Sequence, residues 1–121
     1  MTPVIYIVDD EVISLKLLEM CLKGQGYEIH CFSGGVAALE RFKAYPANLV
    51  ITDIFLPDLD GNDLTYSLKQ INPEVKVIAV SGTPDTKYIN VLDNSKRAGS
   101  DLTFCKPVDP DRLIAGVKSL L

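Results

Sequence analysis

The sequence lacks an apolar run near the roughly 20 residues that span a bilayer, and no basic region precedes a hydrophobic one at its N-terminus. It also lacks an excess of positive charge, since 12 Lys and Arg face 16 Asp and Glu, for a net charge of −4. Binding to a nucleic-acid backbone needs clustered Lys and Arg. We therefore expect neither membrane insertion nor direct nucleic-acid binding.

Cysteine and histidine are scarce, which limits the metal sites and disulfides that the chain can form. The three cysteines, Cys21, Cys31 and Cys105, are odd in number and form no C-x-x-C pair. We expect them to be reduced thiols in the core of a cytoplasmic protein. A zinc site is not expected, because His30 is the only histidine and no zinc-ligand spacing is present.

What the sequence does have is the composition of one globular domain. Its 121 residues fall below the usual domain length of about 150. Hydrophobic residues make up 47% and charged residues 23%, which excludes a disordered chain. We therefore expect residues 1–121 to form a single domain.

Short apolar runs alternate with amphipathic stretches along the whole chain. Three runs are wholly apolar, as is typical of strands covered on both faces, and two are mixed. The expected strands are residues 4–8, 27–32, 49–51, 77–80 and 102–105. The expected helices span about residues 12–23, 36–45, 64–71, 84–98 and 113–121.

Five strands that alternate with five helices predict an α/β fold: a doubly wound parallel sheet with helices on both faces. The mixed runs, Tyr27–Phe32 and Leu102–Cys105, suit the two edges of the sheet. With right-handed crossovers this gives the strand order 2-1-3-4-5 of a flavodoxin-like fold. The direction reverses between the first and third strands, so a ligand crevice is expected at their C-terminal ends.

Polar residues follow the strands directly, and all of them therefore lie at this edge of the sheet. In chain order they are Asp9-Asp10-Glu11, Asp53, Ser81 and Lys106-Pro107. Two carboxylates about 5 Å apart repel by roughly 3 kcal/mol at an effective dielectric of about 20, so such a group needs cations. Lys106 supplies one, and oxygen-only ligands suit Mg²⁺. A metal held by carboxylates beside a lysine favours phosphoryl transfer.

Each of these elements also has a simpler explanation on its own. Glu11 suits the N-terminus of a helix through the helix dipole, and Ser81 can cap the next helix. Residues 56–61 can form a turn. It is the coincidence of such elements after four strands, beside the predicted crevice, that favours a functional site.

Together these motifs resemble the receiver domain of response regulators in two-component signalling, over essentially the whole chain. The matching motifs are V-D-D-E at Val8–Glu11, D-I-F-L-P-D-L-D-G at Asp53–Gly61, V-S-G at Val80–Gly82 and K-P at Lys106–Pro107. The resemblance implies a domain that accepts a phosphoryl group and relays the signal to a downstream effector domain or protein by conformational change.

The resemblance also implies a role for each matching residue in this exchange. Asp53 would be the phosphoacceptor and would attack a phosphohistidine of a histidine kinase or histidine phosphotransfer protein. Ser81 would hydrogen-bond a phosphoryl oxygen, and Lys106 would pair with the phosphoryl group, followed by Pro107 in a peptide that can be cis. Such a domain is no conventional enzyme: it catalyses its own phosphorylation and its own slow dephosphorylation.

The implied cofactor is Mg²⁺. Its implied ligands are Asp10, Asp53 and the main-chain carbonyl of Phe55, and Asp9 would act mostly through a bound water. The Phe55 side chain could also hinder an attacking water and so lengthen the lifetime of the phosphorylated form.

One position departs from the family pattern. The family usually has Phe or Tyr three residues before the lysine, as a switch coupled to the Ser/Thr position, and here that place is Thr103. The aromatic Phe104 comes one residue later, and a one-residue offset places a side chain on the opposite face of a strand. We therefore expect Phe104 to pack in the core.

The helix at residues 12–23 carries more apolar residues than one buried stripe requires. The simpler explanation is that neighbouring elements cover it. The alternative, implied by the resemblance, is a docking face for a helical phosphodonor.

Three other functions fit less well, and one alternative stays open. A phosphatase of the haloacid dehalogenase type needs a second aspartate at the position of Phe55. A flavin-binding module has no use for clustered acids and a lysine. A dinucleotide-binding domain needs a G-x-G-x-x-G motif after the first strand, and the sequence has none there. The open alternative is a receiver-like interaction module that is not phosphorylated in the cell. It stays open because Thr103 stands where the family usually has the aromatic switch residue.

Overall fold

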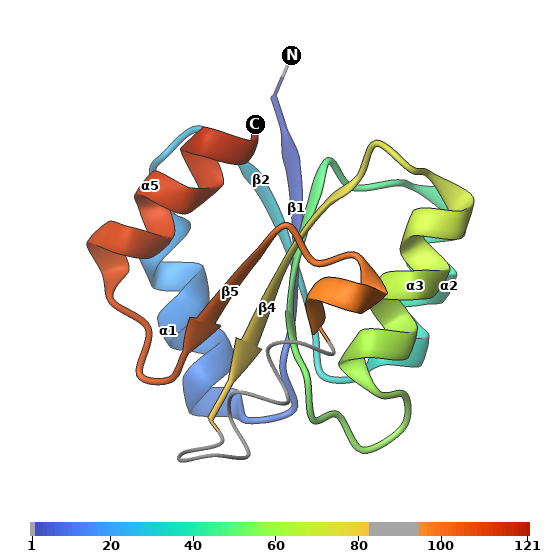
Figure 1. Cartoon of the computed structure of the whole chain (residues 1–121). Helices are drawn as coiled ribbons and strands as arrows, with labels where there is room; N and C mark the ends of the chain where they lie inside the picture. Colours follow the sequence, from blue (N-terminus) through green and yellow to red (C-terminus); the bar gives the residue numbers. More distant parts are fainter. Residues whose placement is uncertain (1, 83–94) are drawn as a thin grey trace.

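A parallel sheet forms the centre of the computed structural model, which describes residues 2–82 and 95–121 (Figure 1). Its strands are β1 (Val4–Val8), β2 (Glu28–Phe32), β3 (Leu49–Asp53), β4 (Lys76–Ser81) and β5 (Leu102–Cys105). They pair in the order β2-β1-β3-β4-β5, and each pair is parallel. The predicted strand order and both predicted edge strands are therefore confirmed.

Helices cover both faces of this sheet. They are α1 (Val12–Leu22), α2 (Gly35–Ala44), α3 (Gly61–Ile71) and α5 (Pro110–Leu120). In Figure 1, α1 and α5 lie on one face, and α2 and α3 lie on the other. Residues 95–98 are helical and end at Gly99, whose φ of 114° suits glycine. The rest of the helix predicted over residues 84–98 lies outside the described residues.

The interior strands contain long apolar runs because they contribute alternate residues to two cores. Tyr6 and Val8 of β1 belong to the core beneath α2 and α3, whereas Ile5 and Ile7 belong to the core beneath α1 and α5. All five residues of β1 are buried. The edge strand β2 is only partly buried, which is why its sequence is mixed.

The aromatic Phe104 packs where the one-residue offset predicted. It lies against the core beneath α1 and α5, together with Leu102. A Cβ added at Gly116 of α5 would lie only 3.2 Å from Phe104 Cζ, so glycine lets the helix approach the ring closely. The prediction that Phe104 is a packing residue is confirmed.

Two strands run further than the apolar pattern indicated, and this matters for the site. The ladder between β3 and β4 continues to the pair Asp53 and Val80, and the ladder between β4 and β5 continues to Ser81 and Cys105. Asp53 and Ser81 are therefore the last residues of strands rather than the first residues of loops. Their backbones are held by the sheet itself.

The cysteine prediction is only partly right. All three thiols are free, and Cys21 and Cys31 are partly buried against the core beneath α1 and α5. Cys105, however, is exposed. It is the last residue of β5, which lies at the edge of the sheet formed by the described residues. The prediction of a core position is wrong for this residue.

The surface of α1 also differs from the simpler expectation. Only Leu18 and Leu22 of this helix are buried. Four apolar side chains are instead largely exposed: Val12 (63%), Ile13 (75%), Leu17 (57%) and Met20 (69%). The explanation that neighbouring elements cover this helix is therefore wrong for these four residues, whereas Leu15 and Cys21 do pack against the core beneath α1 and α5. None of the helices in residues 2–82 and 95–121 combines the length and the apolar character that crossing a membrane requires.

Candidate functional site

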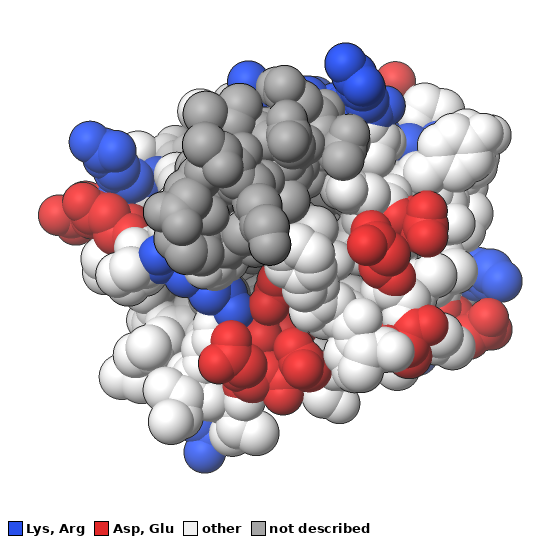
Figure 2. Space-filling model, turned by 60° about the horizontal axis from the view of Figure 1, so that its bottom comes forward, with Lys and Arg blue, Asp and Glu red and all other residues white. Residues whose placement is uncertain are grey.

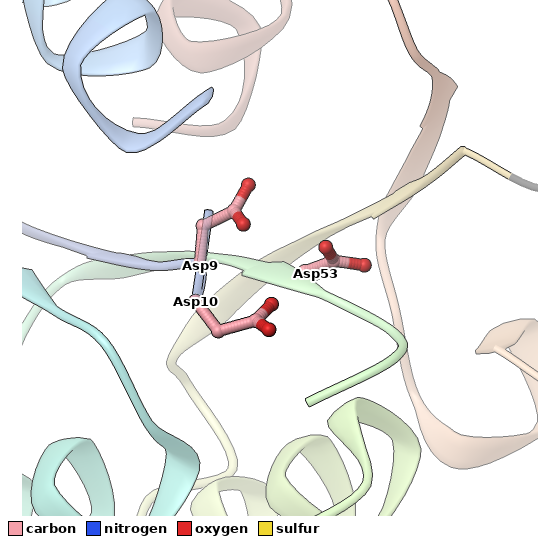
Figure 3. A group of neighbouring side chains, drawn as sticks. All are labelled: Asp9, Asp10 and Asp53. Carbon is pink, nitrogen blue, oxygen red and sulfur yellow. The ribbon is translucent and has the colours of Figure 1, made fainter. Parts of the chain in front are cut away.

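Three carboxylates meet at the C-terminal ends of the central strands. Asp9 and Asp10 follow β1, and Asp53 ends the neighbouring strand β3. One carboxylate oxygen of each can be chosen such that all lie within 4.8 Å of one another (Figure 3). Asp9 and Asp53 are buried, at 1% and 7% exposure, and Asp10 is exposed. The prediction that these three carboxylates lie together at the C-terminal ends of the strands is confirmed.

The backbone after Asp53 is fixed by a close return of the chain. The Gly61 N–H donates to the Ile54 carbonyl at 2.8 Å. A Cβ at Gly61 would lie 2.2 Å from the Asp53 carbonyl oxygen, so only glycine permits this approach. The Phe55 N–H in turn donates to Asp53 Oδ1 at 3.1 Å. The phosphoacceptor candidate is therefore held both by its strand and by the first residues of the following loop.

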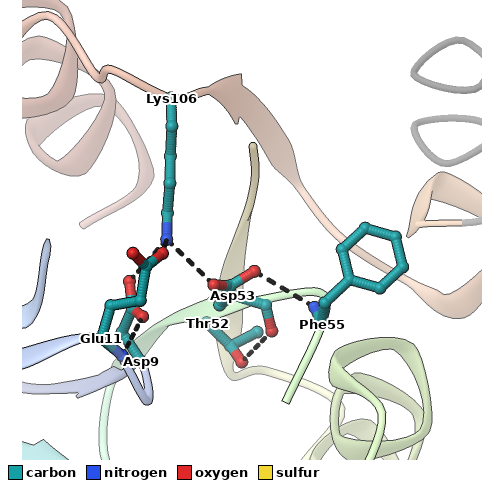
Figure 4. Close-up of polar contacts among 6 residues, drawn as sticks. All are labelled: Asp9, Glu11, Thr52, Asp53, Phe55 and Lys106. Atoms are coloured by element: carbon teal, nitrogen blue, oxygen red, sulfur yellow. Dashed lines mark hydrogen bonds and ion pairs between the residues drawn. The ribbon is translucent and has the colours of Figure 1, made fainter. Parts of the chain in front are cut away.

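Lys106 reaches the same carboxylates from the end of β5. Its Nζ lies 2.9 Å from Asp9 Oδ2 and 2.9 Å from Asp53 Oδ2 (Figure 4). Its backbone N–H donates to the Ser81 carbonyl at 2.8 Å, which ties the end of β5 to the end of β4. The peptide between Lys106 and Pro107 is cis, as the family resemblance suggested.

Glu11 is the residue whose contact with Lys106 the sequence analysis missed. It was assigned to the helix dipole, and it does stand at the N-cap of α1, but its side chain makes no capping hydrogen bond. Its Oε1 instead lies 3.2 Å from Lys106 Nζ, and its N–H donates to Asp9 Oδ1 at 2.9 Å. The signal was its position directly after Asp9 and Asp10, which brings a fourth carboxylate to the same strand end.

The pKa values of Asp53 and Lys106 reflect burial set against their mutual attraction. Burial raises the pKa of Asp53 above its ordinary value, and this outweighs the lowering effect of Lys106 and of the Phe55 N–H. Burial lowers the pKa of Lys106, but the hydrogen bonds and charges of Asp53 and Asp9 raise it by more, so the pKa lies above its ordinary value. Lys106 is therefore charged at neutral pH.

The pocket formed by these groups has a volume of about 280 Å³. It is lined by Asp10, Glu11, Asp53, Phe55, Gly82 and Lys106. Acidic side chains gather at this edge of the molecule in Figure 2. Three carboxylates, those of Asp9, Glu11 and Asp53, contact the single ammonium group of Lys106, and the carboxylate of Asp10 lies beside them. This surplus of negative charge suits a divalent cation. Because Asp9, Asp10 and Asp53 offer oxygen atoms alone, the donor set fits Mg²⁺ rather than a softer metal.

Two of the remaining predicted residues, Ser81 and Phe55, are found at or beside this pocket, and Thr103 lies within β5. Ser81 is fully buried at the end of β4. Phe55 lines the pocket with a side chain that is 53% exposed. Thr103 pairs with Ala79 in the sheet. Their neighbours along the strands belong to the core beneath α1 and α5, so the side chains of Thr103 and Ala79 are on the opposite face of the sheet.

An apolar groove of about 350 Å³ adjoins the pocket. It runs between α1 and the segment that follows β5, and its walls include Ile13, Leu17, Pro107 and Val108. It shares Glu11 and Lys106 with the acidic pocket, so the two hollows are continuous in their lining. The exposed apolar face of α1 therefore leads directly to the carboxylates.

Comparison with known proteins identifies relatives of the whole chain. A family model described as the response regulator receiver domain matches residues 5–118. The transcriptional regulatory protein CssR of Bacillus subtilis is 36% identical over 121 residues, which are 100% of this chain and 52% of that protein. The response regulator protein TodT of Pseudomonas putida is 27% identical over 118 residues, which are 98% of this chain and 51% of that protein. The chain thus spans about half the length of these curated relatives.

A solved structure with the same fold covers nearly the entire chain. The crystal structure of a CheY-like response regulator receiver domain protein from Methanospirillum hungatei JF-1 has a TM-score of 0.89 and 29% sequence identity to this chain. The match covers 98% of this chain and 93% of that one. The likeness therefore includes both the sheet and the elements that surround the acidic pocket.

Proposed function

The chain belongs to the response regulator receiver domain family of two-component systems, and we propose that residues 1–121 form one receiver domain that is phosphorylated on Asp53. The observation that carries the proposal is that Asp53, buried at the end of β3, meets Lys106 and the Asp9–Asp10 pair in one pocket. These groups come from three separate strand ends. A merely structural ion pair would not need the additional carboxylates.

In the proposed reaction, a carboxylate oxygen of Asp53 attacks the phosphorus of a phosphohistidine. The new P–O bond forms as the P–N bond breaks, and the electron pair of the P–N bond leaves with the imidazole nitrogen. Oδ1 of Asp53 accepts the Phe55 N–H and Oδ2 contacts Lys106, so the carboxylate is held in a fixed orientation before the donor arrives. Lys106 would then pair with a phosphoryl oxygen, and the Ser81 hydroxyl would donate a hydrogen bond to another.

The residues that would hold Mg²⁺ are Asp10, Asp53 and the main-chain carbonyl of Phe55, with Asp9 acting through a water. A bound divalent cation supplies positive charge that offsets the negative charge of the phosphoryl oxygens. The chain itself contributes the three clustered carboxylates and the loop that carries Phe55.

We propose that the same site slowly hydrolyses its own aspartyl phosphate. A water must approach the phosphorus opposite the Asp53 oxygen, from the open side of the pocket. Phe55 is one of the residues that line this pocket and it is 53% exposed, so we propose that its bulk restricts the approach of the water. We therefore expect a long-lived phosphorylated form.

The partner that delivers the phosphoryl group is proposed to be a histidine kinase or a histidine phosphotransfer protein. Its helical surface would bind the exposed apolar face of α1, where Ile13 and Leu17 line the groove that leads to Lys106. The three free thiols fit a reducing, cytoplasmic compartment. The downstream partner would be an effector domain or protein, because the relatives CssR and TodT are about twice as long as the matched region.

The experiment that tests the proposal is labelling with acetyl phosphate, a small phosphodonor that needs no docking surface. We expect the protein to gain one phosphoryl group in the presence of Mg²⁺ and none after its chelation. Asp53→Asn should abolish the labelling. Asp63→Asn makes the same change at an exposed aspartate of α3 and should leave the labelling intact. An unlabelled wild-type protein would favour the alternative, a receiver-like interaction module that is not phosphorylated.

A further inference from the structure

Asp58 connects the loop after Asp53 to the N-terminus of α2. Its Oδ1 accepts the Gly35 N–H at 2.9 Å, and its Oδ2 accepts the Val36 N–H at 3.1 Å. The first N–H groups of a helix have no partner within the helix. The N-cap residue of α2 is Gly34, which has no side chain to accept them. Asp58 therefore caps α2 from a loop more than 20 residues further along the chain.

The packing around this contact shows that the loop is fitted closely to the helix. A Cβ at Gly34 would lie 2.8 Å from Asp58 Oδ2, and a Cβ at Gly35 would lie 3.0 Å from Leu59 Cβ. Gly34 has a φ of −150°, which any residue adopts, so its lack of a side chain matters here for space. Leu56 and Leu59 of the loop pack against the core beneath α2 and α3.

The charge of Asp58 suits this position. The N–H groups of Val36 and Gly35 lower the pKa of the Asp58 carboxyl below its ordinary value. The side chain is therefore a carboxylate at neutral pH, and a negative charge is favourable at the positive end of the helix dipole. The contact thus combines two hydrogen bonds with a charge of the right sign.

The loop that Asp58 holds is the one that lines the acidic pocket. At its base the Gly61 N–H bonds to Ile54, and at its end Asp60 caps α3 by accepting the Asn62 N–H at 2.7 Å. Between these ends Asp58 is the attachment to α2. Phe55 lies between Ile54 and Asp58, so the path of its main chain depends on both attachments.

We propose that Asp58 is a positioning residue for the metal site. By fastening residues 54–60 to α2, it fixes the Phe55 main chain and thereby raises the affinity of the pocket for Mg²⁺. We call this contact the Asp58 clamp. The inference rests on the proposed function, because it concerns the loop that supplies one of the proposed ligands.

The test measures Mg²⁺ affinity directly, by isothermal titration calorimetry without any phosphodonor. We expect Asp58→Ala to weaken binding about tenfold, the lower end of the usual effect of changes outside the first ligand shell. Asp58→Asn should lie between the wild type and Asp58→Ala, because an amide oxygen can still accept one of the two N–H groups. Gly34→Ala should weaken Mg²⁺ binding as Asp58→Ala does, because the new Cβ would push the Asp58 carboxylate away from the N–H groups of α2.

A matched control separates positioning from a general loss of stability. Asn72 accepts the Glu74 N–H at 3.0 Å in the turn after α3, at the opposite edge of the sheet. Asn72→Ala also removes a side-chain acceptor from a backbone N–H. We expect it to lower the free energy of unfolding but to leave the Mg²⁺ affinity at the wild-type value.

A second readout, the order parameter of the Phe55 N–H from ¹⁵N relaxation, keeps the two proposals distinguishable. The clamp predicts a lower order parameter in Asp58→Ala and in Gly34→Ala than in the wild type. Wild-type Mg²⁺ affinity in both folded variants would overturn the clamp and leave the proposed function standing. If the wild type itself binds no Mg²⁺, the proposed function fails, and an unchanged Phe55 order parameter would overturn the clamp as well.

Discussion

Replacing Lys106 by Met should destabilise the protein in a way that depends on pH. The substitution keeps most of the side-chain volume and removes the charge. In the wild type, Lys106 Nζ lies 2.9 Å from both Asp9 Oδ2 and Asp53 Oδ2. Both carboxylates are almost fully buried, so water replaces only part of the attraction that they lose when the ammonium is removed.

The expected size of the effect follows from these distances and from the burial. Each contact at 2.9 Å has a gross attraction of about 6 kcal/mol at an effective dielectric of about 20. The net effect is smaller, because Lys106 also loses water on burial, and breaking one partner of a buried pair typically costs about 3–5 kcal/mol. The Lys106 side chain retains 17% exposure, which favours the lower end. We expect the free energy of unfolding to fall by about 3 kcal/mol at pH 7.5.

The pH dependence has a definite sign. The folded-state pKa of Asp53 is raised, so the native state holds this proton more tightly than the unfolded chain does. Such a group makes the protein less stable as pH rises from the unfolded pKa through the folded one. Without Lys106, which lowers the pKa of Asp53, the folded pKa rises further and this window widens upward. The difference between variant and wild type should therefore shrink on going from pH 7.5 to pH 5.

The measurement is urea unfolding followed by circular dichroism, since the chain has no tryptophan to report by fluorescence. Lys43→Met is the matched control, because the ion pair of Lys43 with Glu40 is exposed on both sides and should change stability little. Millimolar Mg²⁺ should restore more stability to Lys106→Met than to the wild type if the pocket binds the cation. The electrostatic reasoning is refuted if Lys106→Met is as stable as Lys43→Met at pH 7.5, or if its deficit is the same at both pH values.

Two further predictions concern the phosphorylated form and the donor. Phe55→Asn should speed the loss of the phosphoryl group severalfold, because a smaller polar side chain opens the pocket to water; a rate no faster than wild type, measured by the decay of labelled protein, would contradict this. Leu17→Lys should weaken transfer from a phosphohistidine protein about tenfold, equivalent to about 1.4 kcal/mol, and leave labelling by acetyl phosphate unchanged. Tyr66→Lys, at an exposed position of α3, is its control, and equal loss of transfer in both variants would count against docking on α1.

The fold was predictable from the sequence because burial and strand order leave the same mark on composition. β1 is buried on both faces and is apolar throughout, whereas the edge strand β2 alternates. The acidic pocket followed from topology alone, since the C-terminal ends of parallel strands lie at one edge of a sheet. That is why Asp9, Asp53 and Lys106 could be placed together although they are far apart in the chain.

Other features leave no local trace in the sequence. The spacing of the apolar residues in α1 is the same whether or not a neighbouring element covers them. Only the structure could therefore show which of them are exposed. The contact of Asp58 with α2 joins a loop residue to the start of a helix more than 20 positions earlier in the chain. The P-D-L-D-G segment alone is typical of a turn. Glu11 could be placed at a helix start, but its choice of Lys106 over the helix N–H groups depends on how near the ammonium lies.

The packing of Phe104 restricts how a phosphorylated Asp53 could signal. Phe104 lies on the face of the sheet that α1 and α5 cover, with its Cζ 3.2 Å from the place of a Cβ at Gly116. Ser81 alternates with Val80, which belongs to that same core, so Ser81 faces the opposite side of the sheet. The ring therefore cannot follow a movement of the Ser81 hydroxyl. Lys106 can respond to phosphorylation of Asp53 instead, because it contacts Asp53 directly and leads into the segment before α5. A change in the partners of Lys106 on phosphorylation would move the wall of the groove beside α1.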